Sequence, residues 1–193
     1  MRPTLAGSLK MLAMGAAGGT VLDGFHSHSG TISYPDPVFS MEAWWVPLLF
    51  AGAYTLLGVS WALARKLSGA APIAPVARWT CALAFGVLYF ASGYLPVSNA
   101  VKLGVLVAGF LVLWLATDRS WGTVAVGLLA AVLGPTTEVV LVHLHLFAHL
   151  QPDVAGIPMW LPGLFYLASA PGAGPLMAWL GHGHATATHP SAA

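Results

Sequence analysis

The chain has 193 residues, of which 58% are hydrophobic and 7% are charged, and its formal net charge is +1. An ordinary soluble domain is about one quarter charged, so this composition argues against a soluble enzyme and indicates one membrane domain. No cluster of basic residues is present to bind phosphates, which argues against a nucleic acid partner. The single cysteine, Cys81, leaves no disulfide framework and no multi-cysteine zinc site.

Six apolar runs follow one another along the chain, and each is long enough for a helix of about 20 residues that crosses a membrane. Lys10 interrupts the first run, so we expect a retained helix there and not a cleaved signal peptide. The connection at 23–42 is rich in Gly, Ser, Pro and Asp, which is typical of an ordered polar loop. The predicted fold is an all-α polytopic bundle with six transmembrane helices, at residues 4–22, 43–64, 76–95, 99–117, 121–149 and 157–180.

The basic residues predict the orientation of this bundle, because Lys and Arg accumulate in short cytoplasmic loops. All of them except Lys102 map to one side of a six-span bundle. Both chain termini are therefore predicted to be cytoplasmic. The opposite side is predicted to carry a set of acidic residues and histidines, namely Asp23, His26, His28, Asp36, Glu42 and Asp153.

The fifth run is longer than one straight crossing and contains Gly134-Pro135, so we expect a bend there. Helical spacing predicts one face that carries small and polar residues, namely Gly127, Ala131, Gly134, Glu138, His145 and His149. This face can serve helix packing, line a pocket or hold a metal ion. A metal ion is the weakest of the three, because a helix spreads Glu138 and His149 over about 16 Å.

The sixth run contains four prolines and three glycines, and Gly181 directly follows it, so its helix is predicted to be broken or wide. Irregular backbone in a membrane is tolerated beside protein or a cavity, so a cavity lined by Trp160 and Phe165 is one hypothesis and a structural kink is the other. Beyond this run, His182, His184 and His189 lie in a tail that we do not expect to hold a metal ion.

The turn between the fourth and fifth runs, Thr117-Asp118-Arg119-Ser120, is the one compact charged group at a predicted membrane edge. Asp118 can cap the start of the fifth helix, where its negative charge suits the helix dipole. The alternative is that Asp118 forms a docking site for a partner helix.

Three further stretches are Ala43-Trp44-Trp45-Val46-Pro47, then Leu113-Trp114 leading to Asp118-Arg119-Ser120, and lastly Pro152-Asp153 followed by Trp160-Leu161-Pro162. Together they resemble the Insig proteins, sterol-responsive regulators of the endoplasmic reticulum membrane. The resemblance covers residues 40–180 and agrees with the order and spacing of the spans. The Ala- and Gly-rich composition suits a bacterial homologue.

The resemblance implies a non-enzymatic bundle that binds a sterol or another lipid and, in animal members, retains sterol-sensing partner proteins. By position, Phe85 and Trp114 look like family residues near the sterol site, and Asp118 looks like the aspartate needed for partner engagement. Val101 stands where the family has a glutamine, which removes a polar group that could meet an oxysterol hydroxyl. The predicted lipid-binding set is Phe85, Val101, Phe110, Trp114, Thr136, Glu138 and Trp160.

We therefore expect a lipid-binding sensor or scaffold with no catalytic residues, no metal and no cofactor other than a bound sterol or diacylglycerol-like lipid. The expected partners are membrane lipid and further copies of the chain, with a sterol-sensing protein only in a host that has one. The membrane would be the inner membrane of a bacterium or the endoplasmic reticulum of a eukaryote. The rival is a small intramembrane metal- or histidine-dependent enzyme that uses Glu138, His26, His28, His143, His145 and His149.

Overall fold

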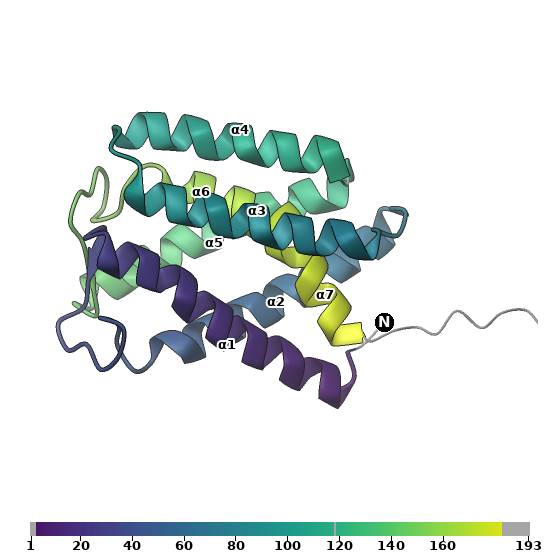
Figure 1. Cartoon of the computed structure of the whole chain (residues 1–193), viewed down its shortest axis with the longest axis horizontal. Coiled ribbons are helices and arrows are strands. Elements are labelled where there is room, and N and C mark those ends of the chain that lie inside the picture. Colours follow the sequence, from purple (N-terminus) through teal and green to yellow (C-terminus); the bar gives the residue numbers. More distant parts are fainter. Residues whose placement is uncertain (1–2, 118, 183–193) are drawn as a thin grey trace, which may run out of the picture.

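The computed structural model describes residues 3–117 and 119–182 as a bundle of helices with one short pair of strands (Figure 1). The longer helices are α1 (Leu5–His28), α2 (Val46–Leu67), α3 (Pro75–Tyr94), α4 (Asn99–Thr117) and α5 (Trp121–His143). The remaining elements are β1 (Ile32–Ser33), β2 (Ala148–His149), α6 (Leu161–Leu167), the π-helix η1 (Ala168–Ala173) and α7 (Gly174–His182).

Helices α1 to α5 are each long and apolar enough to cross a membrane. Many of their large hydrophobic side chains are exposed on the outside of the bundle, where lipid replaces water as the solvent. The helical membrane fold predicted from the composition is therefore confirmed. Only α4 has the predicted bounds, Asn99–Thr117, and the other long helices begin or end elsewhere.

The predicted sixth span is confirmed to be irregular. Three consecutive pieces, α6, η1 and α7, follow one another without a loop from Leu161 to His182. Pro171 lies inside η1 and has no backbone N–H to donate to the preceding turn, which suits a wide turn of helix. Together these pieces pack against α1, α2, α3, α4 and α5, so the most irregular segment is also the most central one.

The two ends of the bundle differ in what they carry. One end, called here the loop end, holds the connections at 29–45, 95–98 and 144–160. Strands β1 and β2 join two of these connections as an antiparallel pair, with Ile32 opposite His149. At the other end, called the terminal end, the backbone N–H of Thr4 donates to the carbonyl of Gly181. Both ends of the described chain therefore lie together, on the right of Figure 1.

The first and fifth predicted spans show the largest errors at their ends. The first was expected to end at residue 22, but α1 continues to His28 and buries Asp23 and His26. The helix can continue because both polar side chains find partners inside the fold. The fifth was expected to reach residue 149, but α5 ends at His143 and the chain turns where His145 has a φ of 57°. A left-handed residue cannot continue a right-handed helix.

The start of α5 is capped from within the turn that joins it to α4. Its N-cap is Ser120, whose side chain accepts a hydrogen bond from the backbone N–H of Thr123 at 3.2 Å. Ser120 therefore holds the N-cap position, and the capping role predicted for Asp118 stays a prediction. Asp118 itself, with its proposed partner contact, lies outside the described residues, as do His184 and His189.

Candidate functional site

The aromatic residues predicted to bind lipid lie together in the centre of the bundle. Phe85 is 4% exposed, Phe110 is 1% exposed and Trp160 is 1% exposed, and all three belong to one apolar cluster. Trp114 packs against this cluster, with its ring stacked on Phe110, and its indole N–H donates to the carbonyl of Ser120 at 3.1 Å. These rings come from α3, from α4 and from the residue just before α6, and they fill the space between those elements.

Two other members of the predicted set lie on the outside of the bundle. Val101 is half exposed on the first turn of α4. Thr136 is exposed on α5, and its hydroxyl donates to the carbonyl of Val132 at 2.7 Å. This bond is a local one within the helix. The structure therefore does not bring Val101 and Thr136 together with the aromatic cluster.

Glu138 pairs with a histidine that sequence spacing placed far from it. Because the chain turns back after α5, strand β2 returns His149 to Glu138, and the His149 Nε2 lies 2.7 Å from the Glu138 Oε2. The predicted face of α5 that included His145 and His149 is therefore wrong, since neither residue is helical. The other ring nitrogen of His149 is buried and has no hydrogen-bond partner in the described chain.

A second polar pair, Tyr34 with Asp23, lies beside the pair of Glu138 and His149. Tyr34, in the loop after β1, donates its hydroxyl proton to Asp23 Oδ2 at 2.7 Å. Burial raises the pKa of Tyr34 far above its usual value, and the charge of Asp23 raises it further. Glu42 and Glu138 also act electrostatically on Tyr34. One phenol therefore sits among three carboxyl groups from α1, the 29–45 loop and α5.

Glu42 is the most unusual of these acids. Its side chain is fully buried, and neither carboxyl oxygen has a hydrogen-bond partner in the part of the chain that the structure describes. A buried ionised carboxylate without a partner is costly, so the neutral acid is favoured. Burial raises the pKa of Glu42 to about 8, with a further contribution from Asp23. Glu42 is therefore mostly protonated at neutral pH.

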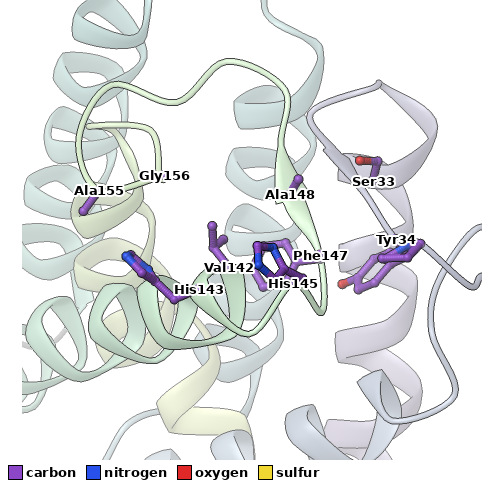
Figure 2. Close-up of a pocket in the computed structure, with 10 residues that line it drawn as sticks. Ser33, Tyr34, Val142, His143, His145, Phe147, Ala148, Ala155 and Gly156 are labelled. Carbon is purple, nitrogen blue, oxygen red and sulfur yellow. The ribbon is translucent and has the colours of Figure 1, made fainter.

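A pocket of about 800 Å³ opens beside these groups at the loop end (Figure 2). Its size falls in the range of about 300–1,000 Å³ that is typical of small-molecule sites. Figure 2 shows Tyr34 facing His145 and Phe147, with His143 on the last turn of α5. The lining is Ser33, Tyr34, Pro35, Val142, His143, His145, Phe147, Ala148, Ala155 and Gly156.

Sequence reasoning placed Asp23 and Glu42 among exported charges, and it missed Tyr34 altogether. A tyrosine between Ser33 and Pro35 in a polar loop gives no periodic signal. The weak signals that were available are the two acids at positions 23 and 42. Each directly adjoins an apolar run, where a charge is costly without a partner.

The histidines of the rival enzyme hypothesis lie in different environments. The His28 Nδ1 lies 2.8 Å from the carbonyl of Gly24, and the His143 Nδ1 lies 2.8 Å from the carbonyl of Val139. His26 instead contacts the Ser92 hydroxyl. Within residues 3–117 and 119–182, no three His, Cys, Asp or Glu side chains come together as a metal site.

Solved structures resemble the chain over almost its whole length. A cross-linked trimer of MvINS has a TM-score of 0.81 and 20% sequence identity, covering 93% of this chain and 96% of its own. MvINS from Mycobacterium vanbaalenii, a mycobacterial Insig homologue, has a TM-score of 0.79 and 20% identity, covering 94% of this chain and 95% of its own. No family model and no curated protein matches the sequence.

At this identity, the likeness shows the fold. It agrees with the five apolar helices, and together they make the chain an integral membrane protein. The three short sequence stretches that resemble Insig proteins pointed to the same architecture. The chain therefore has the fold of a bacterial Insig homologue.

Proposed function

We propose that this protein is a non-enzymatic membrane sensor or scaffold that binds a sterol or a diacylglycerol-like lipid. The observation that carries the proposal is the loop-end pocket of this Insig-like fold. Tyr34 lines the pocket and donates a hydrogen bond to the buried Asp23. The wall of the pocket is apolar and aromatic at Val142 and Phe147, which suits a lipid. Its polar part is small, which suits a ligand with few hydroxyl groups.

Tyr34 supplies a specific reason for a hydroxyl-bearing ligand. Its own proton is donated to Asp23, so its oxygen can still accept a hydrogen bond. The free hydroxyl of a diacylglycerol or the single hydroxyl of a sterol is a donor of this kind. A carboxylate or phosphate headgroup fits less well, because the acidic side chains of Asp23 and Glu138 act on Tyr34 and offer an anion no positive charge.

Sensing would follow from the two loops that form the pocket. Residues 33–35 and 142–148 both line it, and β1 and β2 join these segments by backbone hydrogen bonds. A lipid that fits one relative position of α1 and α5 better than another would favour that position by its difference in affinity. This coupling requires no catalytic step.

The proposal includes assembly and orientation. MvINS has been crystallised as a cross-linked trimer, which supports a homo-oligomer for the similar fold here. We further propose six spans, with α6, η1 and α7 as the sixth, and cytoplasmic termini, because Lys10, Arg65, Lys66 and Arg78 lie toward the terminal end. A partner contact at Asp118 belongs to the proposal only for hosts that contain a sterol-sensing partner.

The test is a Tyr34→Phe variant of the full chain, purified in a mild detergent. It keeps the ring and removes only the hydroxyl oxygen, so we expect diacylglycerol retention to fall about three- to tenfold, the value of one hydrogen bond. Native mass spectrometry with added dioleoylglycerol or cholesterol measures retention of each lipid. Tyr94→Phe is the matched control, because Tyr94 is 43% exposed and lies outside this pocket. Equal retention by wild type and Tyr34→Phe would remove this site from the proposal.

A further inference from the structure

Lys102 is a buried cation at the loop end, away from the other basic residues. It lies on the first turn of α4 and is 7% exposed. Its Nζ donates to the carbonyl of Ser92 at 2.8 Å and lies 5.9 Å from the centre of the Trp160 ring. No described carboxylate forms an ion pair with it. A buried ammonium has three donors and needs a compensating anion, and Ser92 satisfies only one donor.

The ammonium lies on the wall of a second pocket of about 350 Å³. This pocket lies between the end of α1, the 95–98 connection and the start of α4, and it shares no lining residue with the first pocket. Ser29, Thr31, Ser98 and Asn99 give it a polar lining, and Trp160 is part of its apolar lining. The two pockets therefore differ in character, because the first is near three acids and the second contains a cation.

The start of α4 adds positive potential to the same pocket. The backbone N–H groups of a first helical turn have no carbonyl partner within the helix, and the helix dipole makes this end partially positive. Ser98 caps part of the turn by accepting from the Val101 N–H at 3.4 Å. Residues 96–99 and Lys102 all line the pocket, so the helix end and the ammonium face the same space.

The neighbouring charged and polar groups leave Lys102 uncompensated. Asp153 near the rim already accepts from the Asn99 amide and from the Met159 N–H, each at 2.8 Å. On the other side, Ser92 donates its hydroxyl proton to the Tyr89 carbonyl, so it accepts from the His26 Nε2–H. The imidazole of His26 thus presents no negative charge to the ammonium.

We propose that this second pocket binds an anionic phosphate group, with Lys102 as the main electrostatic contact. The phosphate is carried by a lipid headgroup of the leaflet at the loop end or is a free phosphate ion. Exposed apolar side chains at the rim, Tyr94 and Val97, favour the lipid source, because acyl chains can lie against them. The site is independent of the hydroxyl-binding pocket proposed above, and it adds a second class of ligand.

Thermal unfolding of the full chain in a neutral detergent tests the proposal. The single cysteine, Cys81, is fully buried, so a thiol-reactive fluorescent dye reports unfolding. The probes are dioleoylphosphatidylglycerol, dioleoylphosphatidylcholine as the lipid without net charge, and inorganic phosphate against chloride at equal ionic strength. We expect phosphatidylglycerol to raise the melting temperature more than phosphatidylcholine does. If inorganic phosphate also raises the melting temperature, the site accepts the free ion as well as the lipid.

Lys102→Met should weaken phosphatidylglycerol binding about tenfold or more, the value of a hydrogen bond to a charged group. Lys66→Met, an exposed lysine at the terminal end, is the matched control and should bind as wild type does. Lys102→Arg keeps the charge and should retain binding, which guards against a Lys102→Met variant that does not fold. No anion-dependent shift in wild type, or equal shifts in wild type and folded Lys102→Met, would overturn the proposal.

Discussion

The two halves of this bundle differ in their buried contacts, which are closely packed glycines in one half and polar pairs in the other. Toward the terminal end, α1, α2 and α7 meet through glycines that let the backbones approach closely. A Cβ at Gly58 would lie 2.8 Å from the Met177 Cβ, and one at Gly7 would lie 2.0 Å from the Gly181 carbonyl oxygen. Toward the loop end, the buried contacts are polar pairs, such as Asp23 with Tyr34.

The difference separates what a membrane protein needs for folding from what it can use for binding. Apolar contact between glycine faces needs only shape, because the neighbouring lipid is as apolar as the interface. Buried acids and a buried ammonium are costly in the same medium and stay only where partners or ligands compensate them. The loop end therefore contains both proposed sites, and the terminal half supports it.

The largest expected effect comes from Trp160→Ala, which tests whether the loop end is also a packed core. The side chain is 1% exposed and contacts the His26 ring, so its removal leaves a cavity. We expect the free energy of unfolding to fall by about 3–5 kcal/mol. Dye reaction with Cys81 during thermal unfolding measures it. Trp44→Ala, at a tryptophan that is 64% exposed, is the control, and an equally small effect in both variants would show a loosely filled loop end.

A smaller effect is expected from Gly58→Ala, which tests the tight packing of the terminal half. The new methyl group would overlap Met177 of α7, and overpacking of this kind costs about 1–3 kcal/mol. Gly52→Ala on the same helix is the matched control, because a Cβ there meets nothing within 4 Å. The same unfolding assay compares the two variants. Equal melting temperatures would mean that α2 and α7 can separate without cost.

Much of the apolar part of this architecture could be predicted from the sequence. The bounds of α4 follow from an apolar run between Asn99 and Thr117 that only Lys102 interrupts with a charge. The irregular sixth helix follows from its prolines, including Pro171 inside η1. The Insig-like fold follows from three short motifs whose order and spacing are retained. Each of these features depends on local composition or on a resemblance. None of them requires knowledge of long-range contacts.

The polar sites could not be predicted in the same way, because loops create them. His149 reaches Glu138 because the chain reverses after His143, and Tyr34 donates to Asp23 from the loop that directly follows β1. The glycines and polar residues of 23–42 predict a loop, but they do not predict the directions of its side chains. The lipid-binding roles predicted for Val101 and Thr136 stay predictions, as both residues lie on the outer surface.

The last expected effect, small for a change of a single pH unit, concerns the pH dependence of the loop end. Glu42 has a pKa of about 8 in the fold against an ordinary value of 4.5. The folded state therefore holds a proton that the unfolded state releases between these two pH values. The stabilising contribution of neutral Glu42 is fully present below about pH 4.5 and is lost as pH rises through about 8. Stability should fall across this window by at most about 1.4 kcal/mol per pH unit.

Glu42→Gln replaces the acid with an amide that does not titrate. The decline in stability between about pH 5 and 8 should therefore become shallower. Melting curves at several pH values measure the slope, with Asp36→Asn, at an exposed acid of the same loop, as the control. An unchanged slope in Glu42→Gln would place the proton on another carboxyl of the cluster. The contrast between the two halves would then rest on the acid pairs at Asp23 and Glu138, since the terminal half buries no carboxyl group among its described residues.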